Sequence, residues 1–203
     1  GEDVGKDSKT YTAFRTLGAT PAQALDESKR APMYWGDQPI VEAPAYVGAV
    51  VLFLFVLALF LVNGRLKWWL VGGSVFALLL SYGKNLEFLT NFFIDYIPLY
   101  NKFRAVTSIQ VILELCIPVL AVMGLVKVFD GNQKKDQKLK ALKYTSIITG
   151  GLALVFLLFQ TSLFDFVGVN DGFYRQNYGQ AFIDAIKEDR KTIFNQDTIR
   201  TLV

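Results

Sequence analysis

The amino-acid sequence predicts an all-α polytopic membrane protein, with four transmembrane helices and with interfacial amphipathic helices in its outer loops. Three observations lead to this fold class: four apolar stretches are almost free of charge, charged residues bound each of them, and lysines concentrate in the segments between them. A helix needs about 20 apolar residues to cross a hydrocarbon core about 30 Å thick. The predicted spans cover residues 45–62, 68–82, 105–126 and 144–164.

The first two spans differ in how clearly the sequence marks them. From Val50 to Leu57 every residue is apolar, whereas a helix in a soluble core normally keeps a polar face. This pattern disfavours the alternative of a fully buried soluble core. The second stretch is short and contains Gly72-Gly73, but Lys67 and Lys84 can extend it by reaching to the two interfaces, so we expect it to span as well.

The distribution of Lys and Arg predicts the orientation of the chain. Residues 127–143 contain six lysines and the turn at residues 63–67 contains two basic residues, so the positive-inside rule assigns both segments to the cytoplasmic side. Residues 83–104 and both ends then lie on the extracytoplasmic side. The expected organisation is an outer segment (1–44), a four-span unit (45–164) and an outer amphipathic segment (165–203).

The composition excludes several kinds of chemistry. The chain has no histidine and a single cysteine, Cys116, so it forms no internal disulfide and offers neither a Cys/His metal site nor a Ser/His or Cys/His catalytic pair. No metal or cofactor is expected. The net charge of +3 comes mainly from the predicted inner loop, which argues against a nucleic-acid partner. Gly1 begins neither an initiator-methionine segment nor a signal sequence, so we expect a piece of a longer protein.

The first outer segment ends in an aromatic loop, Tyr34-Trp35-Gly36-Asp37-Gln38-Pro39, just before the first span. The prolines restrict the backbone, and the two aromatic rings supply rigid surface. We favour an interfacial anchor. The alternative is a lid or substrate-contact loop to which Tyr34, Trp35 and Asp37 contribute.

The second outer loop leads into the third span. Apolar residues recur at helical spacing over residues 86–97, which predicts a short amphipathic helix in the interface, ended by Pro98. Lys102 and Arg104 follow at the outer mouth of the helix bundle. A guanidinium presents a planar fork of donors that suits phosphate oxygens, and a lysine adds a point charge. These two residues form the predicted lipid-phosphate-binding site.

A polar stripe is predicted on the third span. In a regular helix, Arg104, Thr107, Gln110, Glu114 and Pro118 share one face about 120° wide. Glu114 would lie about 15 Å beyond Arg104, where a carboxylate costs several kcal/mol unless it is paired, protonated or wet. Gln110 and Glu114 are therefore candidates for an intramembrane polar site. The alternative is that Glu114 pairs with a cation on a helix outside this chain, simply to hold the bundle together.

The end of the chain predicts a further amphipathic helix over residues 178–194, through Phe182, Ile183, Ile186 and Ile193. The run Lys187-Glu188-Asp189-Arg190-Lys191 has mixed charge. We expect it to form a solvated face, with a headgroup-binding patch as the second interpretation.

Several of these segments resemble the YfhO family of bacterial membrane proteins in its Bacteroidetes-like form. The resemblance covers residues 32–203. It rests on Tyr34-Trp35-Gly36-Asp37-Gln38-Pro39, Tyr46-Val47-Gly48-Ala49, Ser81-Tyr82-Gly83-Lys84-Asn85, Pro98-Leu99-Tyr100-Asn101-Lys102-Phe103-Arg104 and Glu188-Asp189-Arg190. After Arg104 the family tends to have Ala or Thr, then small residues and Met, whereas this chain reads Ala105-Val106-Thr107-Ser108-Ile109. That departure leaves the acceptor open.

The resemblance implies the C-terminal part of a large polytopic protein of the bacterial inner membrane, related to the GT-C glycosyltransferases. Such enzymes transfer a sugar from a polyprenyl-phosphate carrier to an envelope polymer or other acceptor on the outer face, and the lipid-linked sugar is a substrate rather than a cofactor. Their catalytic acid lies in the first outer loop near the amino terminus, so it is expected outside this chain, while Lys102 and Arg104 hold the carrier phosphate.

The expected partners are the lipid bilayer, the lipid-linked sugar, and the remaining spans of the parent protein or partner membrane subunits. The alternative function is non-enzymatic. In that case the chain is a structural or accessory subunit, or part of a transporter in which Glu114 relays protons.

Overall fold

The computed structural model describes residues 4–35, 46–98, 102, 106–131 and 133–202, and of residues 84, 85, 106 and 107 it describes the backbone alone. Over these residues the chain is helical and contains no β-strand, which confirms the predicted all-α class. Two helices, α6 (Gln110–Phe129) and α7 (Lys135–Leu163), are long and apolar enough to cross a membrane. The prediction of four transmembrane helices is therefore not confirmed, because the other two helices are shorter.

The chain divides into two compact units, which we call unit 1 and unit 2. Unit 1 consists of Gly1–Pro44 and Leu152–Val203, and unit 2 is Ala45–Gly151. The division falls inside α7, whose backbone departs from helical geometry at Phe159 (φ −109°, ψ 16°). The boundary predicted from the sequence was residue 165, where charged residues resume.

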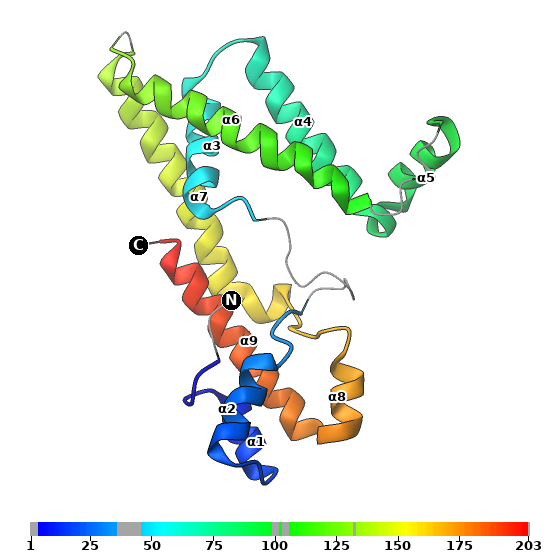
Figure 1. Cartoon of the computed structure of the whole chain (residues 1–203). Coiled ribbons are helices and arrows are strands. Elements are labelled where there is room, and N and C mark those ends of the chain that lie inside the picture. The colour runs from blue at the N-terminus through cyan, green and yellow to red at the C-terminus, as the bar shows by residue number, and fades with distance from the viewer. Residues whose placement is uncertain (1–3, 36–45, 99–101, 103–105, 132, 203) are drawn as a thin grey trace. The chain divides into compact units, whose positions relative to one another are not determined.

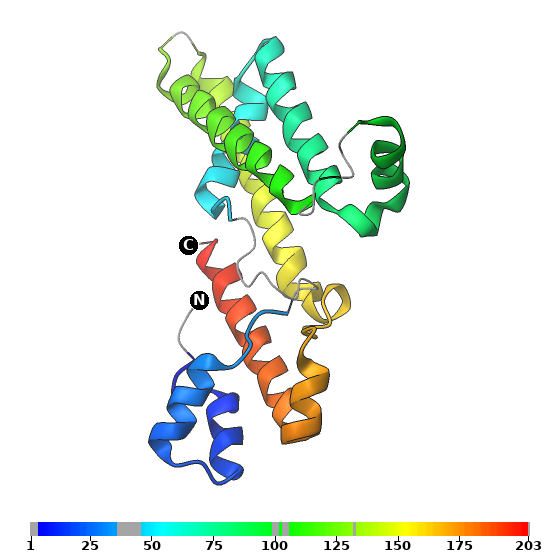
Figure 2. The same cartoon turned by 45° about the vertical axis from the view of Figure 1, so that its right-hand side comes forward.

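Unit 2 is built around α6. The helices α3 (Ala49–Leu61) and α4 (Arg65–Ser81) both pack along it, and Figures 1 and 2 show them beside α6 in both views. A Cβ added at Gly124 of α6 would lie 2.7 Å from the Cβ of Ala58 on α3, so the glycine permits this close approach of the helices. Beside Gly73 of α4, an added Cβ would lie 3.4 Å from Sγ of Cys116. Small residues therefore set the helix spacing in unit 2.

The helices that correspond to the first two predicted spans are short. α3 has 13 residues and α4 has 17, lengths of about 20 Å and about 26 Å. α4 begins at Arg65, earlier than predicted, because Gly64 takes a φ of 116° that lets the chain turn sharply before the helix. Lys67 was predicted to reach for the interface, but it is 9% exposed, and its Nζ donates to the carbonyl oxygen of Leu59 at 3.2 Å.

The third and fourth predicted spans also begin at different residues. A 3-10 turn, η3 (Val106–Ile109), precedes α6, so the α-helix starts at Gln110 rather than at residue 105. α7 starts at Lys135 rather than at residue 144. Five of the six lysines assigned to the inner loop consequently lie in helices, since lysine is a good helix former. The described residues between the two helices are 130, 131, 133 and 134.

The amphipathic helix predicted over residues 86–97 is present as α5 (Glu87–Tyr96), which follows the 3-10 turn η1 (Gly83–Leu86). It buries none of its residues within the described part of the chain. The rings of Phe88, Phe92 and Tyr96 are exposed, whereas Phe93 contacts Phe76 of α4, and the interfacial location of α5 stays a prediction.

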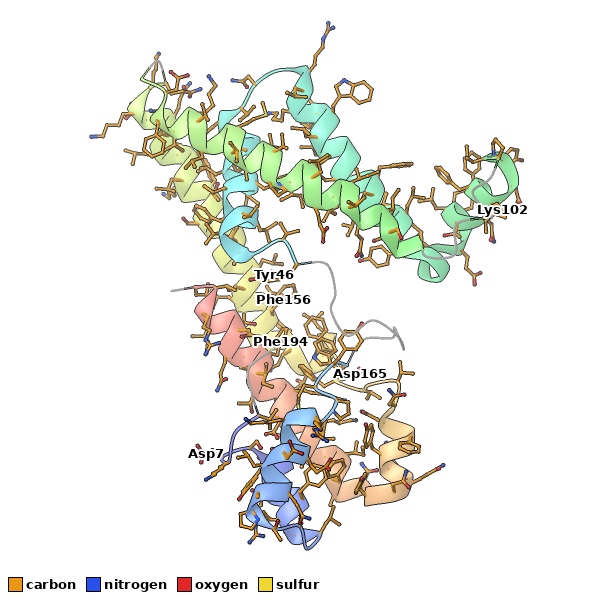
Figure 3. All side chains as sticks on the ribbon, in the orientation of Figure 1. Asp7, Tyr46, Lys102, Phe156, Asp165 and Phe194 are labelled. Carbon is orange, nitrogen blue, oxygen red and sulfur yellow. The ribbon has the colours of Figure 1, made fainter. Side chains whose placement is uncertain are left out.

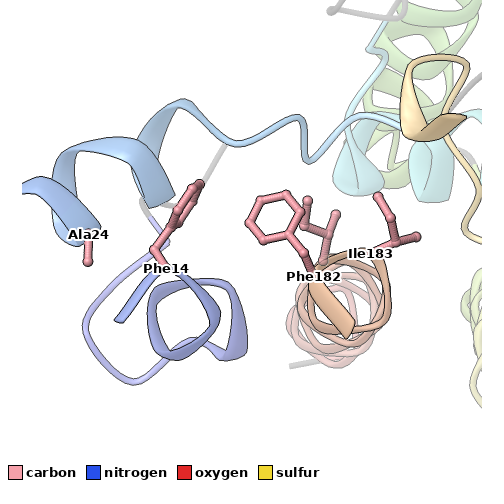
Figure 4. Close-up of a cluster of buried hydrophobic side chains, with 5 residues drawn as sticks. Phe14, Ala24, Phe182 and Ile183 are labelled. Carbon is pink, nitrogen blue, oxygen red and sulfur yellow. The ribbon is translucent and has the colours of Figure 1, made fainter. Parts of the chain in front are cut away.

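Unit 1 contains α1 (Lys9–Thr16), α2 (Pro21–Arg30), α8 (Asp171–Tyr178) and α9 (Gln180–Arg200), together with the last turns of α7. α1 packs against α2 and α9, and α8 packs against α9. The buried core of these contacts consists of Phe14, Ala24, Phe182, Ile183 and Ile186. Figure 4 shows the rings of Phe14 and Phe182 directed at each other, with their centroids 4.8 Å apart. The helix predicted from the apolar spacing of residues 178–194 is confirmed, and it starts after Gly179, whose φ is 87°.

Candidate functional site

Unit 1 contains a buried ion pair between α8 and α9. Arg190 of α9 is 1% exposed, and Asp171, the first residue of α8, is 2% exposed. Nη1 of Arg190 donates to Oδ2 of Asp171 at 2.8 Å, and Nη2 donates to Oδ1 at 2.9 Å. The backbone N–H of Gly168 also donates to Oδ2 of Asp171, at 2.9 Å. This two-pronged geometry is the strong form of a guanidinium–carboxylate contact.

The other donors of Arg190 bind backbone carbonyl groups. Nε and Nη2 both donate to the oxygen of Pro32, at 3.1 and 2.6 Å, and Nη1 donates to the oxygen of Phe166 at 2.8 Å. All five N–H groups of the guanidinium therefore have an acceptor, and none is left for a ligand. Arg190 is a structural clamp that fastens the segment after α2 to the segment between α7 and α8.

The charge of Asp171 follows from the same contacts. Burial raises the pKa of Asp171, but the hydrogen bonds from Arg190 and from the N–H of Gly168, together with the positive charges of Arg190 and Lys187, outweigh it. The pKa of Asp171 consequently lies below its usual value. The carboxylate is therefore ionised at neutral pH. The ion pair with Arg190 requires this charge, whereas a general acid would have to carry a proton.

The prediction that residues 187–191 form a solvated face is wrong for Asp189 and Arg190, which are buried. Asp189 is 8% exposed, and its carboxylate accepts the backbone N–H groups of Lys9 at 3.0 Å and Thr10 at 2.7 Å, which caps α1. The sequence did contain the signal. Asp189 and Arg190 lie three and four residues after Ile186, so both belong to the apolar face of α9.

Trp35 belongs to an aromatic cluster in unit 1. Its ring centroid lies 5.3 Å from that of Phe164, 4.9 Å from that of Phe166 and 6.3 Å from that of Phe194, in tilted or edge-on contacts. The segment is held closely at Gly168, where an added Cβ would lie 3.1 Å from the carbonyl oxygen of Tyr34. Trp35 therefore makes packing contacts within unit 1, and the interfacial anchor stays a prediction.

The alternative for this loop, a lid or substrate-contact role, concerns the residues that follow Trp35. Asp37 and the rest of residues 36–45 lie outside the described residues. The structure fixes the segment 32–35 that leads into this loop, through the Arg190 clamp and the aromatic cluster. Tyr34 is half-buried in that segment.

The predicted phosphate-binding pair is described for one member. Arg104 lies outside the described residues, whereas Lys102 is exposed, and Figure 3 places it beside α5. Its side chain makes no hydrogen bond or ion pair with the described part of the chain, so its charge is available to an anionic ligand. Phosphate binding by the pair stays a prediction.

Gln110 and Glu114 lie on the first two turns of α6, about 40° apart around the helix and about 6 Å apart along it. Gln110 is half-buried, and Glu114 is exposed without a partner among the described side chains. The stripe predicted from Arg104 assumed one regular helix, but the 3-10 turn at Val106–Ile109 interrupts it. The structure thus keeps Gln110 and Glu114 together in unit 2, whereas Tyr34 and Trp35 belong to unit 1.

Within the described ranges, no three His, Cys, Asp or Glu side chains lie close enough to hold a metal ion. Cys116 is buried between α4 and α6, so it is a packing residue. Comparisons of the chain with protein-family models, with curated proteins and with solved structures found no match. The basis for a function is therefore the residue pattern together with this geometry.

Proposed function

We propose that this chain is part of a GT-C-like membrane glycosyltransferase of the bacterial inner membrane, which transfers a sugar from a polyprenyl-phosphate carrier to a cell-envelope acceptor. Unit 2 supplies membrane helices, and Lys102 and Arg104 bind the carrier phosphate on the outer face. The catalytic carboxylate comes from a part of the protein outside these 203 residues. The resemblance to the YfhO family motivates the reaction.

The exposure of α6 and α7 is the observation that carries the membrane location. In the most apolar 18-residue window of each helix, 22% of α6 and none of α7 is buried. A core helix of a soluble protein would bury most of such a window, and an apolar surface of this kind is stabilised by lipid or by another protein. In the proposed arrangement α3 and α4 also cross the bilayer, which thins or is locally adjusted around short helices.

The proposed topology places both ends of the chain outside and residues 130–134 inside. With Cys116 replaced by Ser, single cysteines at three exposed positions report the topology: Lys6, Lys134 and Asn177. We expect a membrane-impermeant thiol reagent to modify Lys6→Cys and Asn177→Cys in intact cells, and Lys134→Cys only after the membrane is permeabilised. Modification of Lys134→Cys in intact cells would refute this orientation.

The phosphate site is tested in the parent protein that contains this chain, by measuring sugar transfer from a polyprenyl-phosphate donor in vesicles. Lys102→Ala and Arg104→Lys are each expected to lower kcat/KM about tenfold or more, since a hydrogen bond to a charged group contributes about 1.5–3 kcal/mol. Lys6→Ala is the control, because Lys6 is exposed and unpaired among the described residues. Transfer within about twofold of the parent in both variants removes the pair from the site.

Glu114 favours a second candidate function, a transporter or accessory subunit in which this carboxylate relays protons or pairs with a cation of another helix. Its charge is exposed and unpaired within the described residues, and a charged carboxylate inside a bilayer costs several kcal/mol. Glu114→Gln separates the roles. A structural pair predicts a loss of about 3–5 kcal/mol in stability, and a relay predicts loss of proton-coupled transport with the fold intact. Unchanged stability and transport exclude both roles.

A further inference from the structure

The α3–α4 turn and the α6–α7 turn lie together at one end of unit 2, in the upper part of Figure 1. Nε2 of Gln133, in the α6–α7 turn, donates to the carbonyl oxygen of Leu61 at the end of α3, at 3.4 Å. Tyr144 of α7 stacks on Phe60 of α3 with ring centroids 6.0 Å apart, and Ala141 packs against Leu61. Basic residues from two distant parts of the sequence therefore share this end, which we call the basic end (residues 63–69 and 127–144).

The basic end has a larger net positive charge than the whole protein. It contains eight Lys or Arg and two Asp, a net charge of +6, whereas the whole chain has a net charge of +3. The remainder of the chain is consequently net negative. The charge of this protein is therefore strongly polarised towards one end of unit 2.

Three of these eight cations are engaged within the protein. Nζ of Lys67 donates to the carbonyl oxygen of Leu59 at 3.2 Å, Nζ of Lys127 pairs with Oδ2 of Asp130 at 2.8 Å, and Nζ of Lys138 donates to the carbonyl oxygen of Asp130 at 2.7 Å. The other five are exposed and have no partner among the described residues. They are Arg65, Lys134, Lys135, Lys140 and Lys143.

Large aromatic rings border these cations. Trp68, Trp69 and Phe129 are 67%, 77% and 80% exposed, and Trp side chains are typical of the boundary between headgroups and hydrocarbon. Along α7, Lys135 and Lys143 are about 12 Å apart, which is about the depth of the headgroup layer and the water beside it. From Tyr144 the helix then continues through mainly apolar residues for about 22 Å to the kink at Phe159, and its last residues extend to Leu163.

We propose that the basic end binds the headgroups of anionic phospholipids, such as phosphatidylglycerol, in the cytoplasmic leaflet. This inference rests on the proposed membrane location of unit 2. The unpaired cations supply the attraction to phosphate, and the exposed rings select a ligand that is part of a bilayer over a soluble anion, because only a bilayer also covers the rings. Each lysine or arginine near an anionic surface strengthens such binding about fivefold.

Energy transfer from tryptophan tests the proposal. The chain with Trp35→Phe keeps two tryptophans, Trp68 and Trp69, both in the basic end. It is reconstituted into phosphatidylcholine vesicles that contain a trace of dansyl-labelled phosphatidylglycerol or dansyl-labelled phosphatidylcholine. We expect more transfer to the phosphatidylglycerol probe, and we expect this preference to weaken at high salt because salt screens exposed charges.

A matched pair of double variants locates the binding. Lys140→Gln/Lys143→Gln is expected to lower the preference for phosphatidylglycerol about fivefold or more. Lys6→Gln/Arg175→Gln removes the same charge from exposed, unpaired positions outside the basic end and is expected to keep the preference. Protection of Cys116 from a thiol reagent verifies that both variants retain the α4–α6 packing.

Two outcomes overturn the proposal while leaving the membrane location intact: equal transfer to both probes from the parent chain, or equal losses in the two double variants. Release of the chain from the vesicles by alkaline carbonate would instead refute the membrane location itself. The two failures are therefore distinguishable in the same preparation.

Discussion

Units 1 and 2 are both helical, but different interactions hold them together. Unit 1 has an aromatic and aliphatic core around Phe182, and beside it a buried ion pair between Arg190 and Asp171. Unit 2 has no buried ion pair among its described residues, and its helices meet through small residues such as Gly124 and Ala58. Its outward faces carry exposed apolar side chains.

This difference indicates whether each unit is suited to water or to lipid. In water, apolar side chains drive folding by leaving the solvent, and charges are buried only when their hydrogen bonds are satisfied. Unit 1 follows this rule. In lipid, apolar side chains gain little by leaving the solvent, so helices associate through close backbone approach at small residues. Unit 2 follows that second rule, which agrees with the proposed membrane location.

Two intrinsic probes report on the two units independently. Trp35 lies in the aromatic cluster of unit 1, and it is the only tryptophan left after Trp68→Phe/Trp69→Phe. Cys116, the single cysteine, is buried in unit 2, so its reaction with a thiol reagent reports opening of the α4–α6 packing. Changes in either unit are measured with the probe of that unit, on the whole chain in detergent.

The largest effect is expected from Arg190→Met in unit 1. The substitution leaves the Asp171 carboxylate buried without its cation and leaves the carbonyl oxygens of Pro32 and Phe166 without donors, so the free energy of unfolding should fall by about 3–5 kcal/mol. Urea unfolding followed by Trp35 fluorescence measures it. Arg30→Met is the control, because the Arg30–Asp26 pair is exposed, and it should cost about 0.5 kcal/mol or less. Similar costs for both variants would show that the clamp does not stabilise unit 1.

As the pH falls, unit 1 should lose stability at a higher pH than unit 2. Because the pKa of Asp171 is lowered by folding, its contribution to stability is present above the unfolded pKa, about 3.9, and is lost as the pH falls through the folded pKa. We expect the Trp35 signal to report unfolding below about pH 4, while Cys116 stays protected. Asp171→Asn, already destabilised, should show a flatter pH dependence. An unchanged pH dependence in that variant would assign the acid transition to other carboxylates.

Gly124→Ala should destabilise unit 2 and leave unit 1 unchanged. The new Cβ would lie 2.7 Å from Cβ of Ala58 and 3.1 Å from the carbonyl oxygen of Leu54, so the α3–α6 contact has to open, at a cost of about 1–3 kcal/mol. Because a less stable unit 2 also opens its α4–α6 packing more often, faster labelling of Cys116 measures the loss of stability. Gly72→Ala is the matched control, because Gly72 of α4 has no atom within 4 Å of an added Cβ. Equal labelling rates in the two variants would argue against close packing at Gly124.

The smallest effect is expected from Asp189→Ala, which removes the carboxylate that caps α1. The loss should be about 0.5–2 kcal/mol, the usual range for a helix cap, because the N–H groups of Lys9 and Thr10 lose their acceptor. Urea unfolding with the Trp35 probe measures it. Glu188→Ala is the neighbouring control, since the Glu188–Lys9 pair is exposed with 3.5 Å between its charged atoms. A larger loss in Glu188→Ala would contradict the cap.

Local patterns in the sequence predicted the helices of unit 2 and one long helix of unit 1, but not α1, α2 or α8. The all-α class, the helix at Glu87–Tyr96 and the helix at Gln180–Arg200 follow from apolar residues at helical spacing. The ends of the helices in unit 2 were less predictable. The charged residues before residue 144 were predicted to lie in a loop. Lysine is tolerated within a helix, however, so α7 starts nine residues before the predicted span.

The candidate site, too, could be predicted only in part from the sequence. Lys102 was predicted from its residue type and position, and its exposure agrees with a role towards an anionic ligand, whereas Arg104 lies outside the described residues. Trp35 was read as an anchor because aromatic residues are common at interfaces. Its contacts with Phe166 and Phe194 depend on a segment that returns to it from the far end of the chain.

By itself the sequence determined the all-α class, the apolar segments and the helix at Gln180–Arg200, since these properties depend on neighbours within about two turns. Only the tertiary structure decided that Asp189 and Arg190 are buried. The backbone groups that they bind lie 180 residues away for Asp189, at Lys9, and 158 residues away for Arg190, at Pro32. A buried charge is stable only when such partners replace the water it loses, and the spacing of residues along one helix cannot reveal whether they do.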